Sequence, residues 1–275
     1  MTNRAVTRTA PAKINLTLHV TGQREDGYHL LDSLVTFAGF GDRITCRRAE
    51  ATSLTVAGPF ARDVPTEANL VLDAARLMGA TAEITLEKNL PVAAGIGGGS
   101  ADAAATLHAL SDLFNLPLPD AASQLTLGAD VPACVRGGVL RMSGIGDRIE
   151  VLATDPLTIP MILVNPGVAL STPGVFARLD RRDNAPMSDD LPPLGDDAFL
   201  DWLSAQRNDL QAPAMGLMPV IADVVAALRA TGGLARMSGS GATCFALYPD
   251  ERDAARALQR IRADHPDWWC EGSFI

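Results

Sequence analysis

The residues between Pro91 and Ala105 have the types and spacing needed to bind an anion. The run reads Pro91-Val92-Ala93-Ala94-Gly95-Ile96-Gly97-Gly98-Gly99-Ser100-Ala101-Asp102-Ala103-Ala104-Ala105. Its glycines let the backbone bend sharply and approach another group closely, because no side chain intervenes. The alanine- and leucine-rich segment from Ser100 to Leu113 predicts a helix, whose first N–H groups and dipole favour an anion such as phosphate. The run therefore predicts a phosphate-binding loop, in which the negative charge of Asp102 has no evident role.

This loop matches neither of two common nucleotide-binding motifs. A Walker A loop ends in Gly-Lys-Ser/Thr, whereas Gly99 is followed by Ser100 and Ala101. A dinucleotide-binding turn follows its strand directly, whereas six residues separate the strand-like run 82–88 from Gly95. A purely structural loop, which lets a helix pack closely on a sheet, remains an alternative interpretation.

The scarcity of lysine singles out two further residues. Of the 23 basic residues only Lys13 and Lys88 are lysines, and the others are arginines. A compact ammonium and a planar guanidinium are not equivalent at a crowded site. Lys13 lies in the apolar, strand-like segment 11–20 and is a candidate for chemistry. We interpret Lys88, at the end of the strand before the loop, as a surface lysine.

Composition excludes several classes of protein. A net charge of −9 argues against general binding to nucleic acid or to an anionic membrane. No apolar run is long enough to span a bilayer, and residues 1–8 lack the apolar segment of a signal peptide. The four cysteines and four histidines are scattered without metal-ligand spacing. We therefore expect a cytoplasmic protein without a zinc site or a disulfide framework.

The 275 residues suffice for one large or two ordinary domains. In the first half, alternation and β-branched content predict strands near 4–9, 12–20, 43–48, 53–57, 82–88, 137–142 and 147–152, with helices near 67–78, 100–115 and 120–127. Residues 181–197 are polar and rich in proline, which predicts a surface loop. The second half alternates strands near 159–164, 234–238, 243–248 and 268–274 with helices near 173–179, 197–204, 217–231 and 250–263. This order predicts a ferredoxin-like α+β layer.

A second glycine-rich segment, residues 237–243, lies between two of these strands. It reads Met-Ser-Gly-Ser-Gly-Ala-Thr. It is either a flexible turn or a place where small residues and hydroxyls allow a nucleotide to approach closely. Together with the first loop it favours a ligand-binding cleft between two domains.

Three of these segments, in this order, resemble the motifs of the GHMP kinase superfamily: Pro11-Ala12-Lys13-Ile14-Asn15, the glycine run from Pro91 to Ala101, and Ser238-Gly239-Ser240-Gly241-Ala242. Two more segments are similar to one branch of it, the kinases that act on 4-diphosphocytidyl-2-C-methyl-D-erythritol in the non-mevalonate isoprenoid pathway. These are residues 21–29, which end in Gly27-Tyr28-His29, and Gly128-Ala129-Asp130-Val131-Pro132. The resemblance covers residues 10–248.

The resemblance implies a two-domain α+β fold, with an N-terminal domain like the second domain of ribosomal protein S5 over residues 1–156 and a ferredoxin-like domain over 157–275. It implies transfer of the γ-phosphoryl group of ATP to the 2-hydroxyl of the methylerythritol, assisted by Mg²⁺ whose ligands are unknown. It places the catalytic pair at Lys13 and Asp130, where a carboxylate that accepts the hydroxyl proton makes chemical sense. From the residues alone, a loop carboxylate that caps a turn is the preferred interpretation of Asp130.

The remaining site residues also follow from the resemblance. ATP is expected along Pro91–Ala101 and near Asn69, although Asn69 at a helix start is equally a helix cap. The cytosine is expected at Tyr28, His29 and Phe176, and the sugar alcohol at Asn15 and Thr172. The implied partner is this small molecule, with no nucleic acid or membrane, in a monomer or homodimer. Other GHMP kinases, such as a mevalonate or homoserine kinase, and a regulator that has lost catalysis remain the alternatives.

Overall fold

The computed structural model describes residues 4–275 and divides into two compact units. Unit 1 comprises residues 1–13, 40–92 and 97–137, and unit 2 comprises 14–39, 93–96 and 138–275. Two strands, β1 (Ala5–Asn15) and β3 (His29–Arg48), run from one unit into the other. The predicted boundary at residue 156 stays a prediction.

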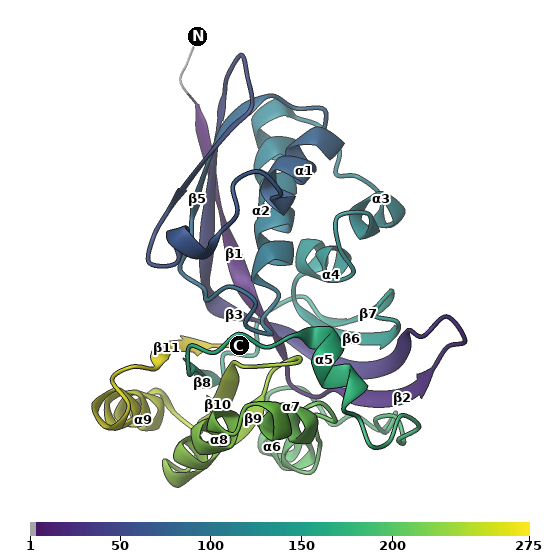
Figure 1. Ribbon diagram of the computed structural model, residues 1–275, viewed down its shortest axis with the longest axis vertical. Helices are drawn as coiled ribbons and strands as arrows, with labels where there is room; N and C mark the ends of the chain where they lie inside the picture. The colour runs from purple at the N-terminus through teal and green to yellow at the C-terminus, as the bar shows by residue number, and fades with distance from the viewer. Residues whose placement is uncertain (1–3) are drawn as a thin grey trace. The chain divides into compact units, whose positions relative to one another are not determined.

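Unit 1 packs helices against strands. Its sheet contains parts of β1 and β3 together with β4 (Ser53–Ala57) and β5 (Ala82–Glu87), where β5 is antiparallel to β3 and parallel to β4. The long helix α2 (Gly98–Phe114) contacts α1 (Leu70–Leu77) and α4 (Val131–Arg136), as Figure 1 shows. A short 3-10 helix, η1 (Ala61–Asp63), and helix α3 (Ala121–Leu125) complete the unit.

The core of unit 1 lies between α2 and the sheet. The helix presents Ala101, Ala105 and Ala109, at intervals of four residues, to the buried side chains of Ile44 and Ile84. Small side chains at this spacing lie on one face of a helix, so the helix axis can approach the strands closely. The beginning of α2 is thereby held at one place relative to β1 and β5.

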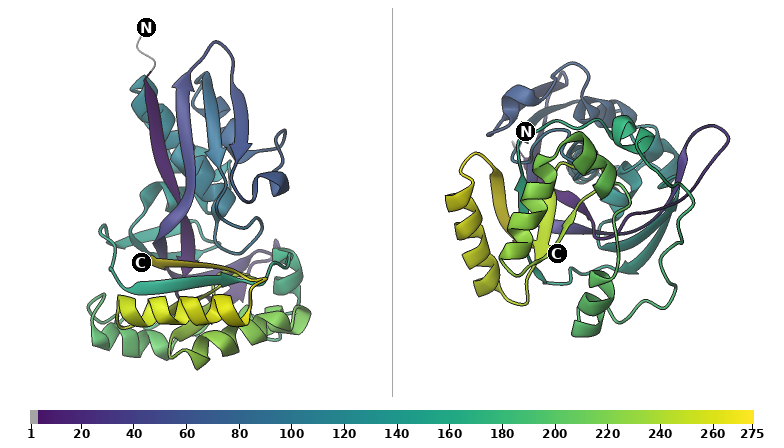
Figure 2. Two further views of the ribbon diagram at one scale, coloured as in Figure 1. Left: turned by 90° about the vertical axis from the view of Figure 1, so that its left-hand side faces the viewer. Right: turned by 60° about the horizontal axis from the view of Figure 1, so that its bottom comes forward.

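Unit 2 contains the predicted ferredoxin-like layer. Strands β8 (Pro160–Asn165), β9 (Leu234–Met237), β10 (Cys244–Leu247) and β11 (Trp269–Phe274) form an antiparallel sheet in the order β11-β8-β10-β9. Helices α8 (Val220–Ala230) and α9 (Glu251–Asp264) cover one face of it (Figure 2). Their apolar faces share one hydrophobic core with the sheet. This order of strands and helices is the ferredoxin-like arrangement that the sequence predicts.

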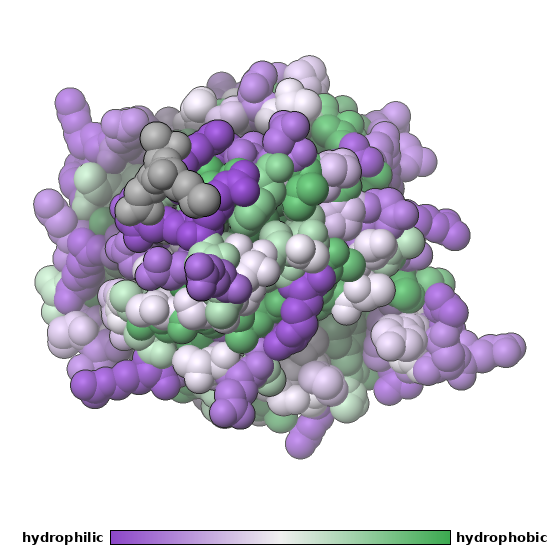
Figure 3. Space-filling view, turned by 90° about the horizontal axis from the view of Figure 1, so that it is seen from above, coloured by the Kyte–Doolittle hydropathy of each residue, from purple (hydrophilic) through white to green (hydrophobic). Residues whose placement is uncertain are grey.

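The rest of unit 2 is built around the first half of β3. This half pairs with β2 (His19–Gln23) and with β6 (Val139–Gly144), which in turn pairs with β7 (Arg148–Ala153). Three shorter helices follow β8: α5 (Thr172–Ala177), α6 (Asp197–Ser204) and α7 (Gln211–Leu217). Between residues 4 and 275, no helix is long and apolar enough to cross a membrane. On the face drawn in Figure 3, hydrophobic residues lie in small groups between hydrophilic ones.

The prediction was wrong for several boundaries. The predicted strands 4–9 and 12–20 are instead the single strand β1 up to Asn15, followed by β2 from His19. Only the last six residues of β3 were predicted, because residues 33–36 are all buried and show no alternation of apolar and polar side chains. The short helices α4 and α7 were also missed, since six or seven residues carry little periodic signal.

Candidate active site

Lys13 and Asp130, which are 117 positions apart in the chain, form an ion pair in unit 1. The Lys13 Nζ atom donates to Asp130 Oδ1 over 2.7 Å. The Lys13 side chain is 7% exposed, whereas that of Asp130 is 36% exposed. A buried ammonium therefore holds one carboxylate oxygen in place while part of the carboxylate stays accessible to a ligand.

The backbone around Asp130 leaves its side chain free for Lys13. Asp130 precedes α4 but makes no side-chain capping hydrogen bond, and Pro132 lies in the first turn of that helix. The alternative interpretation of Asp130 as a capping residue is therefore wrong. One turn further on, burial and the charge of Asp130 raise the pKa of the Cys134 thiol. The thiol is thus protonated, and the accessible carboxylate of Asp130 is the candidate reactive group at this end of α4.

The start of α2 lies beside this pair. The N–H of Ala101 donates to the carbonyl of Gly97 over 2.9 Å, so the preceding N–H groups at Gly98, Gly99 and Ser100 precede the first helical bond. Gly97 has a positive φ of 63°, and a Cβ placed there would lie 3.1 Å from Lys13 Cβ. Glycine is required here for both reasons, and it brings an anion-binding helix end next to the Lys13–Asp130 pair.

Lys88 is not at the surface, so its interpretation as a surface lysine is wrong. It is 3% exposed, and its Nζ donates to Asp42 Oδ2 over 2.5 Å and to Asp102 Oδ2 over 2.7 Å. Burial lowers the pKa of Lys88, but the Asp102 and Asp42 carboxylates outweigh it and raise the pKa above its ordinary value. Burial, together with the charge of Asp42, raises the pKa of Asp102 to about 7. The unexplained charge of Asp102 thus belongs to a buried cluster.

The second glycine segment packs against the first within unit 2. A Cβ on Gly95 would lie 2.6 Å from the Gly241 carbonyl oxygen, and a Cβ on Gly239 would lie 2.5 Å from the Gly95 carbonyl oxygen. The Thr243 N–H donates to the Ala94 carbonyl over 3.1 Å. The glycines at 239 and 241 therefore permit backbone-to-backbone packing, and the segment is more than a flexible turn.

The structure brings two of the predicted cytosine-binding residues together. The rings of His29 and Phe176 stack with their centroids 4.6 Å apart and their planes at 28°. Burial and the charge of Arg182 lower the pKa of His29, and its buried Nε2 atom has no hydrogen-bond partner among the described residues. Tyr28, by contrast, is 62% exposed and is not part of this stack.

Asn15 and Thr172 are both attached to the Ser238–Ser240 segment of unit 2. Ser238 Oγ accepts a hydrogen bond from the Asn15 backbone N–H over 3.1 Å, and Thr172 Oγ1 lies 2.7 Å from Ser240 Oγ. The Asn15 side chain donates to Ser33 Oγ over 2.8 Å and is buried. The two residues predicted for the sugar alcohol thus share a serine-bearing loop, which the sequence analysis associates with a ligand without naming its serines as site residues.

Asn69 caps helix α1. Its side-chain oxygen accepts the N–H of Val71 over 2.9 Å, and its amide donates to the Pro65 carbonyl over 2.9 Å. The helix-cap interpretation is confirmed, and the contact with adenine stays a prediction. Of the loop residues, Val92 is 39% exposed whereas Ile96 is 1% exposed. Ile96 therefore anchors the loop rather than contacting a ligand with its side chain.

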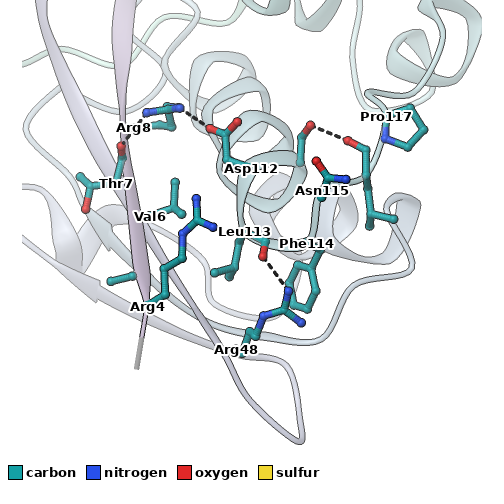
Figure 4. Close-up of a pocket in the computed structure, with 13 residues that line it drawn as sticks. Arg4, Val6, Thr7, Arg8, Arg48, Asp112, Leu113, Phe114, Asn115 and Pro117 are labelled. Atoms are coloured by element: carbon teal, nitrogen blue, oxygen red, sulfur yellow. Dashed lines mark hydrogen bonds and ion pairs between the residues drawn. The ribbon is translucent and has the colours of Figure 1, made fainter. Parts of the chain in front are cut away.

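A hollow of about 1040 Å³ at the other end of α2 contains none of the predicted site residues (Figure 4). Arg48 donates to the Leu113 carbonyl over 2.8 Å and lies over the Phe114 ring, and Arg8 forms an ion pair with Asp112. Cations at a helix C-terminus stabilise it through its dipole and its free carbonyl groups. These contacts indicate a structural role for the two arginines.

Family profiles and similar sequences both relate this chain to the GHMP kinases. Residues 69–138 match the profile of the GHMP kinases N-terminal domain, and residues 187–267 match that of the GHMP kinases C-terminal domain. A protein of Cereibacter sphaeroides named 4-diphosphocytidyl-2-C-methyl-D-erythritol kinase is 58% identical over 267 residues, which is 95% of this chain and 96% of that protein. A protein of the same name from Ruegeria pomeroyi is 54% identical, covering 97% of this chain and 98% of its own length.

Solved structures of kinases also superpose on this chain. A crystal structure of 4-(cytidine 5'-diphospho)-2C-methyl-D-erythritol kinase superposes with a TM-score of 0.79 at 34% identity, covering 98% of this chain and 99% of that one. Homoserine kinase from Cytophaga hutchinsonii superposes with a TM-score of 0.70 at 17% identity, covering 100% of this chain and 96% of that one, which shows a shared fold alone.

Proposed function

The chain belongs to the GHMP kinase family, and we propose that it transfers the γ-phosphoryl group of ATP to the 2-hydroxyl of 4-diphosphocytidyl-2-C-methyl-D-erythritol. The names and the identities of its relatives support this substrate. The observation that carries the proposed chemistry is the Lys13–Asp130 pair beside Gly97, at the start of α2. The reaction places the chain in the formation of isoprenoid precursors by the non-mevalonate route.

In the proposed reaction Asp130 is the general base. A hydroxyl is a weak nucleophile at neutral pH, and a carboxylate within hydrogen-bonding reach accepts its proton as the bond to phosphorus forms. The accessible part of the Asp130 carboxylate suits this role. Lys13 is paired with that carboxylate and would stabilise negative charge on the attacking oxygen and on the transferred phosphoryl group.

The ATP phosphates are proposed to bind at the first N–H groups of α2. Positioning and charge stabilisation supply most of the rate in phosphoryl transfer, and a helix N-terminus supplies both to an anion. The residues proposed to lie along the nucleotide are those of the run from Pro91 to Ala101, with Asn69 on the adenine side. Among these residues the backbone of Gly97–Ser100 is the part that would contact phosphate.

Mg²⁺ would reach this site together with the ATP phosphates. Among the described residues no group of three acidic, histidine or cysteine side chains could hold a metal alone. Mg²⁺ in kinases binds through one or two protein oxygens and the substrate phosphates. Ser100, in the first turn of α2, would offer its hydroxyl oxygen to such an ion beside the phosphates. When bound, the ion would neutralise charge on the phosphates.

The substrate-binding proposals rest on unit 2. The stacked His29 and Phe176 present aromatic faces suited to a flat base, and the unpartnered His29 Nε2 can exchange a hydrogen bond with a cytosine edge. Tyr28 is exposed at the adjacent position and can close over the base. Asn15 and Thr172 offer an amide and a hydroxyl to the hydroxyl groups of the sugar alcohol.

The proposal is tested by turnover of the wild-type protein and of Asp130→Asn with ATP and 4-diphosphocytidyl-2-C-methyl-D-erythritol. The amide keeps the size of the side chain but accepts a proton poorly, so we expect kcat to fall by about a hundredfold to ten-thousandfold. The affinity for ATP, measured by calorimetry, should change little. An unchanged kcat would remove Asp130 as the base.

A substrate panel provides the control. Mevalonate and homoserine offer hydroxyl groups but no cytidine diphosphate, so we expect no transfer to either of them. Phosphorylation of one of these alcohols, without transfer to the cytidyl substrate, would assign the chain to a different branch of the family.

A further inference from the structure

Three charged side chains form a buried cluster beneath the first turns of α2. Asp42, Lys88 and Asp102 are exposed by only 0%, 3% and 4%. The Lys88 ammonium lies between the two carboxylates, at 2.5 Å from Asp42 Oδ2 and 2.7 Å from Asp102 Oδ2. The proposed reaction uses none of the three, and such buried charges are costly unless they are well paired.

The cluster ties together the two ends of the glycine run. Asp42, on β3, also accepts the backbone N–H groups of Asn89 over 2.5 Å and of Leu90 over 2.8 Å through Oδ1. These residues come just before the run, whereas Asp102 is in α2 just after it. A single carboxylate and a single ammonium therefore fix the entry of the loop and the helix that follows.

A compact cation suits the space around Lys88 better than a planar one. A Cβ placed on Gly98 would lie 3.1 Å from Lys88 Nζ, so the ammonium packs directly under the backbone of the first helical residue. A guanidinium is larger and planar. All the other basic residues of the chain are arginines, and its two lysines lie against the consecutive glycines Gly97 and Gly98.

We propose that Lys88, held by Asp42 and Asp102, is a positioning residue that sets the geometry of the phosphate-binding loop and thereby the affinity for ATP. It acts through the backbone of residues 89–90 and of Gly98, and does not touch the nucleotide. This inference rests on the proposed function, which places the phosphates at the start of α2.

The test compares the wild type with Lys88→Arg and Lys88→Met in the full chain. The arginine keeps the charge that both carboxylates need, so it is the variant expected to fold, whereas the methionine removes that charge. Calorimetry with ATP and, separately, with 4-diphosphocytidyl-2-C-methyl-D-erythritol is done at a temperature at which all variants are folded. We expect both variants to bind ATP about tenfold to a hundredfold more weakly, because each disturbs the backbone that the ammonium supports; a loss of this size is that of one charged hydrogen bond.

Affinity for the cytidyl substrate is the internal control. Its proposed contacts lie in the other unit, so it should change by less than about twofold. Asp112→Asn is the matched variant on the same helix, because it removes the ion pair with Arg8 at the far end of α2. We expect this variant to bind ATP as the wild type does.

A second readout covers the case in which Lys88→Met does not fold. Amide hydrogen exchange in Lys88→Arg, measured by mass spectrometry, should be faster at residues 89–101 and unchanged at residues 106–113. ATP affinity equal to that of the wild type in Lys88→Arg, with unchanged exchange at the loop, would overturn the inference. Equal losses of affinity for ATP and for the cytidyl substrate would also overturn it, since they indicate a general structural defect.

Failure of the proposed function has a different signature. A wild-type protein that neither binds ATP nor phosphorylates the cytidyl substrate rejects that function whatever the variants do. An active wild type with unaffected Lys88 variants rejects the positioning role alone.

Discussion

The two lysines of unit 1 differ in what their surroundings let them do. Lys13 is paired with a single carboxylate, that of Asp130, which is partly exposed. Lys88 is enclosed by two carboxylates that are almost completely buried. An ammonium whose partner faces solvent can interact with a bound substrate, whereas an ammonium saturated by buried partners can only hold structure. Burial of the partner, rather than burial of the lysine, therefore separates the proposed catalytic lysine from the positioning one.

Loss of the ammonium should affect the two sites to very different extents. In Lys88→Met two buried carboxylates lose their counter-ion, and we expect the free energy of unfolding to fall by about 3–5 kcal/mol. In Lys13→Met the half-exposed Asp130 can be hydrated, so the loss should be on the order of 1 kcal/mol. Urea unfolding followed by circular dichroism measures both. Equal losses of unfolding free energy in the two variants would contradict the claim that burial of the partner carboxylate distinguishes the two lysines.

The buried cluster should make the free energy of unfolding depend on pH. Burial raises the pKa of Asp102 to about 7 in the folded chain, well above the ordinary value of an aspartate. The folded state therefore holds a proton that the unfolded state has released, and this contribution to stability is present below about pH 4 and is lost as the pH rises through about 7. Asparagine does not titrate, so we expect the free energy of unfolding of Asp102→Asn, relative to that of the wild type, to increase as the pH rises from 5 to 8.

The difference in unfolding free energy between Asp102→Asn and the wild type, measured by urea titration at each pH, isolates this group. The histidines are common to both proteins, so their titration cancels. A difference that does not vary with pH would show that Asp102 stays ionised throughout this range.

A smaller effect is expected from a pair of glycine substitutions. A Cβ on Gly98 would press on Lys88 Nζ at 3.1 Å, whereas a Cβ on Gly99 would meet only Leu70 Cδ1 at 3.7 Å, an ordinary contact. Alanine favours a helix over glycine by up to about 1 kcal/mol. We therefore expect Gly99→Ala to be neutral or more stable than the wild type and Gly98→Ala to be less stable. Thermal unfolding in the absence of nucleotide compares them, and the reverse order would contradict the crowding at Lys88.

The sequence predicted the glycine run, the helix after it and the ferredoxin-like layer, because each has a strong local pattern. The alternation in residues 82–88 and the alanines of α2 are visible without knowledge of tertiary contacts. The pairing of Lys13 with Asp130 came only from the family resemblance, since two residues 117 positions apart share no local signal. The stacking of His29 on Phe176 likewise depends on contacts between distant segments.

The error at Lys88 is instructive because a signal was available. Lysine is rare in this chain, which singles out both Lys13 and Lys88. The position of Lys88 at the end of an alternating strand, however, predicts an exposed side chain. Its partners, Asp42 and Asp102, lie 46 and 14 positions away. Neither carboxylate could be assigned to it before β3, β5 and α2 were known to meet. The rarity of lysine is therefore a better guide to the surroundings of Lys88 than local polarity.

The interleaving of the two units has a consequence for attempts to dissect the protein. The chain passes from one unit to the other after residues 13, 39, 92, 96 and 137. A gene cut at any one point therefore cannot yield two fragments that each contain one whole unit. Truncation from either end removes strands on which the remaining part depends. We therefore expect the chain to fold only as a whole.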